Sequence, residues 1–244
     1  MDDDDDDDNE DAEDAMNTGS PRPSGSSNID TGSGDRPLFQ VLASHVCQCW
    51  REVALNLPVL WTKLDFIDTS QLNKTKNFID RAHGLPLNIS INCTPPKDAD
   101  EDHPFYNHKR FLTQSDLMRI LDLIEPEASR WGEFHFSVIS DGYVQSILSR
   151  LHKIPSAPLL RKFHLFHAVF SYSGYEFFDG NYVPFHGNAP LLESAVFWGL
   201  HIDWDNSLSF LRSLCEFKLG QHPKEVQPSY TTFIQIPLLC TVWC

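Results

Sequence analysis

His201, Asp203 and Asp205 form the densest group of potential metal ligands in the chain, because they alternate along the segment His-Ile-Asp-Trp-Asp. An imidazole and two carboxylates that lie this close together could bind a divalent cation. Aspartate is also frequent in turns, and a turn after a buried strand is the interpretation that we favour for this segment. The sequence therefore predicts no metal site here.

The cysteines and the other histidines offer no better catalytic group. Cys47 and Cys49 are two residues apart, so on a helix their side chains would point ~200° apart, and no second pair stands at the spacing of a zinc site. His164 and His167 could share a face only on a helix, whereas their surroundings predict a strand. The sequence also has no glycine-rich phosphate loop and no nucleophile elbow. We predict that the protein is not an enzyme and uses no cofactor.

Aromatic side chains are the remaining candidates for a functional role, since they are enriched at the energetic centres of protein interfaces. We expect Trp198 and Trp204 to belong to the core. For the aromatic residues between Phe166 and Phe185, core and binding surface both remain open; these are Tyr172, Tyr175, Phe177, Phe178 and Tyr182.

A helix must position the apolar residues between Leu42 and Leu57. Six of them recur at steps of three and four residues, which places them on one helical face that ends at Pro58: Leu42, Val46, Trp50, Val53, Ala54 and Leu57. Trp50 and Trp61 can each bury about 150–250 Å². Two short helices cannot cover this area, so the face requires either the rest of the chain or a partner protein.

The segment from Ser44 to Trp61 resembles the second half of an F-box, as found in fungal (basidiomycete-type) F-box-like proteins. The matching residues are Leu42, Val46, Cys47, Trp50, Arg51, Leu60 and Trp61, within residues 38–66. The helix of the type Leu-Pro-x-Glu-Ile that opens an F-box is missing before Leu38. The resemblance implies a partner, the Skp-family adaptor of a cullin ubiquitin ligase. It also implies the residues that bind this adaptor: Leu42, Val46, Trp50, Arg51, Leu60 and Trp61.

An acidic segment stands where the first half of the motif is missing. Residues 1–36 hold 13 of the 34 acidic and 2 of the 19 basic residues, so their net charge is −11 and that of the remainder is −4. They contain almost no apolar residue, which predicts a disordered tail. We expect the acidic tract to interrupt the F-box, with the first helix encoded upstream of Met1. The remainder shows no basic stripe, which argues against nucleic-acid binding.

Residues 67–244 are predicted to form an α/β substrate-binding region in which strands and helices alternate from residue 63. Strands are predicted at 63–66, 86–92 and 131–138, with helices after the N-caps Ser70 and Ser115 and over 143–151. The stretches 157–165, 189–197 and 211–219 share a leucine pattern, and the first two begin with Ala-Pro-Leu-Leu. This pattern favours an irregular leucine-rich-repeat-like solenoid, with an ordinary α/β domain as the alternative.

The predicted location is the cytoplasm or nucleus. The N-terminus is acidic where a signal peptide would be basic, and no stretch approaches 18 apolar residues, so neither secretion nor a membrane span is expected. The apolar end of the chain, 237–244, leads us to expect that the solenoid is truncated at its C-terminus.

Taken with the resemblance, these features predict the substrate-recognition subunit of a Skp–cullin–F-box ubiquitin ligase. The F-box-like segment 37–66 would dock the adaptor, and the region 67–244 would bind a protein substrate whose identity stays open. The alternative is a stand-alone protein-interaction module, or a fragment, that does not bind the adaptor.

Overall fold

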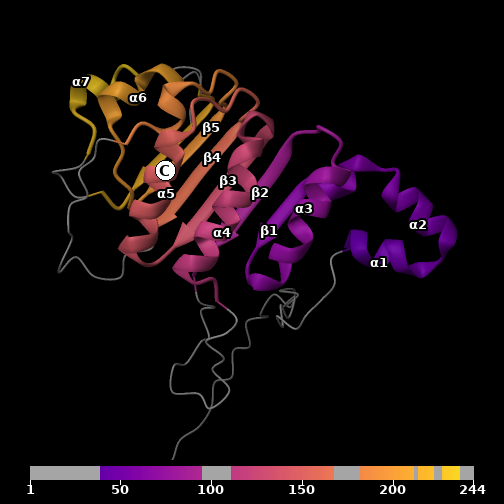
Figure 1. Ribbon diagram of the computed structural model, residues 1–244. Helices are drawn as coiled ribbons and strands as arrows, with labels where there is room; N and C mark the ends of the chain where they lie inside the picture. The colour runs from indigo at the N-terminus through magenta and orange to yellow at the C-terminus, as the bar shows by residue number, and fades with distance from the viewer. Residues whose placement is uncertain (1–38, 95–110, 168–181, 212–213, 223–226, 237–244) are drawn as a thin grey trace, which may run out of the picture. The chain divides into compact units, whose positions relative to one another are not determined.

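A sheet of six parallel strands forms the centre of the protein, and each strand is hydrogen-bonded to the next strand along the chain (Figure 1). The computed structural model describes residues 39–94, 111–167, 182–211, 214–222 and 227–236. In order across the sheet, the strands are β1 Lys63–Phe66, β2 Leu87–Asn92, β3 Trp131–Val138, β4 Lys162–His167, β5 Ser194–Trp198 and β6 Glu216–Gly220. The predicted α/β class is therefore confirmed, while the acidic segment 1–36 lies outside the described residues.

Helices precede the sheet and join its strands. The α-helices of the described part are α1 Phe39–Val46, α2 Gln48–Leu55, α3 Leu72–Arg81, α4 Gln114–Ile124, α5 Asp141–Lys153, α6 Trp204–Leu211 and α7 Tyr230–Phe233. Short 3-10 helices are η1 Pro58–Trp61, η2 Thr69–Gln71, η4 Glu125–Arg130 and η5 Pro184–Gly187. None of the helices that the structure describes is both long and apolar enough to cross a membrane.

The helices that connect the strands cover one face of the sheet. Parallel strands need crossover connections, and right-handed crossovers between sequential strands all fall on the same face. Helices α3, α4, α5 and α6 lie together on that face (Figure 1). Beneath them is the buried apolar face of the sheet: Leu64, Phe66, Ile89, Ile91, Phe134, Phe136, Val138, Phe163, Leu165, Ala195, Phe197 and Phe217.

The alternate side chains of the strands form the other face, which we call the open face. It consists of Lys63, Asp65, Asn88, Ser90, Asn92, Glu133, His135, Ser137, Lys162, His164, Phe166, Ser194, Val196, Trp198, Glu216 and Lys218. From β1 to β4 these side chains are half-buried or exposed, whereas Ser194 and Val196 on β5 are buried. His164 belongs to the open face and His167 is buried on the other side, as alternation along a strand requires.

The helical segment before the sheet is divided at Cys47. The backbone of this residue is extended (φ −158°), and its Sγ accepts the N–H of Trp50 at 3.5 Å, so it ends α1 and caps α2. The prediction of one continuous helix from Leu42 to Leu57 is therefore wrong. Pro58 begins η1, as expected for a residue that cannot continue a helix.

Two predicted N-caps are also displaced by two residues. Asp68, not Ser70, caps the turn before α3, because its Oδ1 accepts the Ser70 N–H at 2.7 Å. Thr113, not Ser115, caps α4: its Oγ1 accepts the Asp116 N–H at 3.2 Å, and Asp116 accepts the Thr113 N–H at 3.1 Å. This reciprocal arrangement is a capping box, which satisfies two helix donors at once.

The leucine pattern of the sequence corresponds to a repeated turn before the strands. In both Ala-Pro-Leu-Leu turns the N–H of the last leucine donates to the alanine carbonyl, at 3.1 and 3.2 Å. Leu160, Leu192 and Leu214 are all buried. Successive turns are joined, since the Glu193 N–H donates to the Arg161 carbonyl at 2.9 Å.

Candidate functional site

Large apolar side chains are exposed on the outer sides of α1, α2 and η1. We call them the apolar helical surface: Phe39, Leu42, Val46, Trp50, Val53, Leu57 and Val59. They are 43–67% exposed, and from Phe39 to Val46 and from Trp50 to Leu57 they recur at steps of three and four residues. Soluble proteins rarely leave so many large apolar side chains uncovered in one short segment, so this surface is typical of a binding site for another protein.

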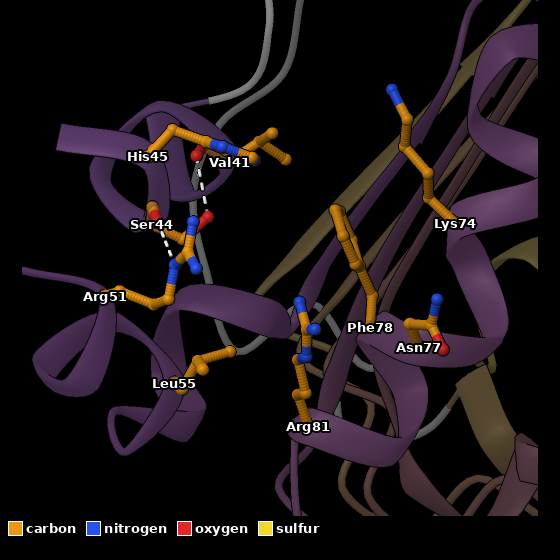
Figure 2. Close-up of a pocket in the computed structure, with 9 residues that line it drawn as sticks. All are labelled: Val41, Ser44, His45, Arg51, Leu55, Lys74, Asn77, Phe78 and Arg81. Carbon is orange, nitrogen blue, oxygen red and sulfur yellow. Dashed lines mark hydrogen bonds between the residues drawn. The ribbon is translucent and has the colours of Figure 1, made fainter. Parts of the chain in front are cut away.

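Small side chains occupy the inward sides of the same two helices. Ala43 and Ala54 are buried there, so α1 and α2 can approach each other closely. The Nε of Arg51 donates to the Ser44 carbonyl at 2.8 Å, close to the C-terminal end of α1 (Figure 2). This carbonyl is among the last four of its helix, which have no partner within the helix. Arg51 therefore fixes α2 across the end of α1 and helps to hold the apolar helical surface in place.

Trp61 attaches this helical hairpin to the α/β region. Its ring is completely buried, and its Nε1 donates to the Ala54 carbonyl at 2.8 Å. The ring packs edge-on against Phe78 of α3, with centroids 5.1 Å apart, and the Arg81 guanidinium lies 4.5 Å from its centroid. A single side chain thus joins α2, α3 and the start of β1.

The six residues predicted to bind an adaptor fall into different environments. Three of them belong to the apolar helical surface: Leu42, Val46 and Trp50. Arg51 is exposed, but it donates a hydrogen bond to the Ser44 carbonyl of α1. Leu60 is half-buried, and Trp61 is buried. Because Trp61 is completely buried, it can act on a partner only by positioning the helices. Sequence reasoning missed Phe39 and Val59, although Phe39 stands three residues before Leu42 and so continues the same helical stripe.

The open face carries three ion pairs. Each of its lysines is paired with a carboxylate of the same face: Lys63 with Asp65 at 3.0 Å, Lys162 with Glu133 at 2.9 Å, and Lys218 with Glu216 at 2.7 Å. Three positive and three negative side chains therefore offset one another. A partner of high net charge gains little from such a surface.

Two histidines lie at the centre of this face. His135 and His164 are paired in the register of β3 and β4, and their rings are perpendicular with centroids 4.6 Å apart. Ser194 Oγ donates to Glu216 at 2.6 Å and lies 2.8 Å from His164 Nε2. Because the hydroxyl has one proton, it accepts from His164, whose Nε2 must carry the hydrogen. Burial and the neighbouring His135 lower the pKa of His164 to about 4.

We expect the stability of the protein to fall as the pH decreases from 6.5 towards 4, in part because of His164. Its pKa is lowered from 6.5 to about 4 in the folded state, so within this window only the unfolded chain takes up the proton. Partial exposure reduces the effect to on the order of 1–2 kcal/mol. Urea unfolding of the wild type and of His164→Gln at neutral and acidic pH measures it. A variant that loses as much stability on acidification as the wild type would contradict the assignment.

Phe166 and Trp198 form an exposed aromatic pair at one end of the open face. They are register partners on β4 and β5 and are 36% and 39% exposed. A Cβ on Gly220, the next position in the register, would come within 2.4 Å of the Trp198 ring, so only glycine leaves room for this ring. The prediction that Trp198 belongs to the core is wrong, because it alternates with the buried Phe197, whereas Trp204 is buried as predicted. Tyr182 is half-buried, and the other aromatic candidates lie outside the described residues.

The residues that could have formed a metal site have structural roles. Asp203 accepts the Asn206 N–H at 3.0 Å and so begins α6, while Asp205 accepts the hydroxyl of Thr232 at the start of α7. Among the described residues, no three histidine, cysteine or acidic side chains are close enough together to hold a metal ion. His201 adds no third ligand to these two carboxylates.

The described cysteines are unpaired and differ in their surroundings. Cys47, Cys49 and Cys215 are exposed thiols. Cys93 is buried, and burial together with the charge of Asp116 raises its pKa to about 12, which keeps it protonated and unreactive. Cys47 caps α2 and Cys93 packs in the core, whereas Cys49 and Cys215 have neither role.

Within the described residues, the apolar helical surface and the open face are therefore candidate interaction sites. Comparisons with protein-family models, with curated proteins and with solved structures find no match.

Proposed function

We propose that the protein is the substrate-recognition subunit of a Skp–cullin–F-box ubiquitin ligase. The apolar helical surface would bind the Skp-family adaptor, and the open face would bind a protein substrate. Such a subunit makes and breaks no bonds; it raises the concentration of the substrate near the ubiquitin-loaded enzyme. The observation that carries the proposal is the exposure of Leu42, Val46 and Trp50 on the outer sides of the F-box-like helices.

The energetics of the apolar helical surface support a protein partner. Trp50 is 54% exposed, which leaves roughly 100 Å² of apolar area, and covering this area would contribute about 2.5 kcal/mol. Six further large apolar side chains add to this surface. Tryptophan is also enriched among the residues that dominate the binding energy of protein interfaces.

The order of the strands supports a leucine-rich-repeat-like arrangement for the substrate-binding region. All six strands follow the order of the chain, and buried leucines recur in the turns before β4, β5 and β6. In a solenoid of this kind each unit is covered by its neighbours, and the strands present one extended surface. The open face, with its balanced charges and the aromatic pair Phe166 and Trp198, would be that surface.

The adaptor-binding role is tested by placing a charge on the apolar helical surface. Leu42→Asp is expected to weaken binding of a purified Skp-family adaptor by about 100-fold, because a carboxylate would be buried without a partner in the interface. Isothermal titration calorimetry with the full chain measures the effect.

Leu191→Asp is the matched control for that experiment. Leu191 is 43% exposed, close to the 50% of Leu42, but it lies in the turn before β5. Its variant is expected to bind the adaptor within about twofold of the wild type. A folded wild-type chain that does not bind the adaptor, or an equal loss in both variants, would exclude the adaptor-binding role.

A second candidate function is a stand-alone interaction module that uses the open face alone. The connection α2–η1–Trp61–β1 has the same design as α4–η4–Trp131–β3. In both, a proline is one of the first two residues of a 3-10 helix, and a buried tryptophan donates its Nε1 hydrogen to the carbonyl seven residues earlier, at 2.8 and 3.1 Å. The F-box-like segment can therefore be one more helix–strand unit of the same fold. Substrate binding without adaptor binding would favour this function.

A further inference from the structure

A cleft lies between the α1–α2 hairpin and α3 (Figure 2). Its volume is about 460 Å³, and we call it the basic cleft because His45, Arg51, Lys74 and Arg81 line it and no carboxylate does. Leu55 from α2 and Phe78 from α3 also line the cleft and give it an apolar part (Figure 2). The α1–α2 hairpin and α3 thus both contribute basic side chains to the same cleft.

The cations of the basic cleft differ from most others in the described structure, because they have no carboxylate partner. Of the twelve lysine and arginine residues that are described, seven form ion pairs. Three of the other five line this cleft: Arg51, Lys74 and Arg81. On the open face, by contrast, every lysine is neutralised. Unneutralised positive charge is therefore concentrated in the cleft.

The two arginines are held in place before any ligand binds. The Nε of Arg51 donates to the Ser44 carbonyl at 2.8 Å, which leaves the two terminal guanidinium nitrogens available to bind a ligand. Arg81 stacks over Trp61 at 4.5 Å, an arrangement that occupies the face of the guanidinium and leaves its edge for a carboxylate. Side chains that are already ordered lose less entropy when they bind a ligand.

We propose that the basic cleft binds an acidic peptide segment of a partner protein. Spaced arginine and lysine groups favour several carboxylates rather than a single anion, and the volume fits a few side chains. Leu55 and Phe78 provide contact for an apolar residue between the acidic ones. Nucleic acid fits less well, because a row of phosphates favours a continuous row of cations, whereas Leu55 and Phe78 also line this cleft.

This site does not depend on the adaptor-binding role. The basic cleft uses the sides of α1 and α2 that face α3, whereas the apolar helical surface uses their outer sides. A charge reversal in the cleft leaves the apolar side chains unchanged, so the two proposals can fail separately.

The test uses the full chain and a synthetic labelled peptide of about eight residues in which glutamate alternates with leucine and serine. Fluorescence anisotropy is expected to show binding in about 50 mM salt that weakens in about 300 mM salt. Lys74→Glu is expected to weaken binding about tenfold, because it replaces attraction with repulsion inside the cleft. Lys76→Glu is the matched control: Lys76 is on the same helix, exposed and outside the cleft, and its variant is expected to stay within about twofold of the wild type.

Three results would overturn the proposal. The first is the absence of peptide binding in low salt. The second is an equal loss of binding in Lys74→Glu and Lys76→Glu, which would show a general effect of net charge. The third is equal or tighter binding of a single-stranded oligonucleotide of the same charge, which would show that the cleft selects phosphates rather than acidic side chains.

Discussion

Replacing Trp61 with alanine is expected to lower the free energy of unfolding by about 3–5 kcal/mol. The ring is completely buried between α2 and α3, where it packs on Phe78 and under Arg81. Its removal leaves a cavity at the junction of three elements and also leaves the Ala54 carbonyl without the Nε1 donor at 2.8 Å. Urea unfolding of the purified chain at neutral pH measures this loss.

Trp50→Ala is the control for Trp61→Ala, because both tryptophans belong to the helical segment before β1 and both variants lose the same atoms. Trp50 is exposed on the outer side of α2, so its replacement is expected to change the stability by less than about 1 kcal/mol. Its effect should instead appear in the binding of a partner. Similar losses of stability in the two variants would show that the hairpin is not attached through Trp61.

The two tryptophans also show what the sequence could and could not predict about the candidate site. Apolar spacing grouped Leu42 with Val46 on α1, because helical periodicity depends only on the local chain. It wrongly continued this helix to Trp50 across Cys47, and it wrongly placed the buried Ala54 on the same face. Spacing does not tell whether such a stripe faces the core. In this structure Ala43 and Ala54 take the inward positions, and the larger side chains remain outside. This choice depends on how α1 and α2 pack against each other, which is a tertiary property.

The strands were more predictable than the surfaces that they form. Alternation correctly identified Leu87, Ile89 and Ile91 on β2 as buried, because every second side chain of a strand points to the same face of the sheet. The histidine and serine contacts between β3, β4 and β5 depend on register across three strands, which no local pattern contains. The error at Trp198 has a different cause, because the side on which it lies follows from local alternation with Phe197.

The helix starts show a different limit, which is competition between nearby capping residues. Ser70 and Ser115 are both acceptable N-caps, but Asp68 and Thr113 stand two residues earlier and take this role. At Thr113 the preference follows from Asp116, whose carboxylate completes the capping box. Since this reciprocal contact lies within four residues, the sequence did contain the signal.

Replacing Phe163 with alanine is expected to destabilise the α/β region by about 3–5 kcal/mol. Phe163 is completely buried on β4, with ring centroids of Phe134, Phe197 and Phe185 at 6.0, 5.7 and 5.2 Å. It therefore joins β3 and β5 to the connection that contains η5. Thermal or urea unfolding measures the loss, which combines the removed apolar contact with the cavity that remains.

Phe166→Ala tests whether the sheet has one covered and one open face. Phe166 lies on the same strand as Phe163 but on the open face, where it is exposed beside Trp198. Because solvent already reaches this ring, we expect its removal to cost less than about 1 kcal/mol of stability and to weaken the binding of a protein substrate. If Phe166→Ala were as destabilising as Phe163→Ala, a further layer would have to cover the open face, and substrate binding there would be excluded.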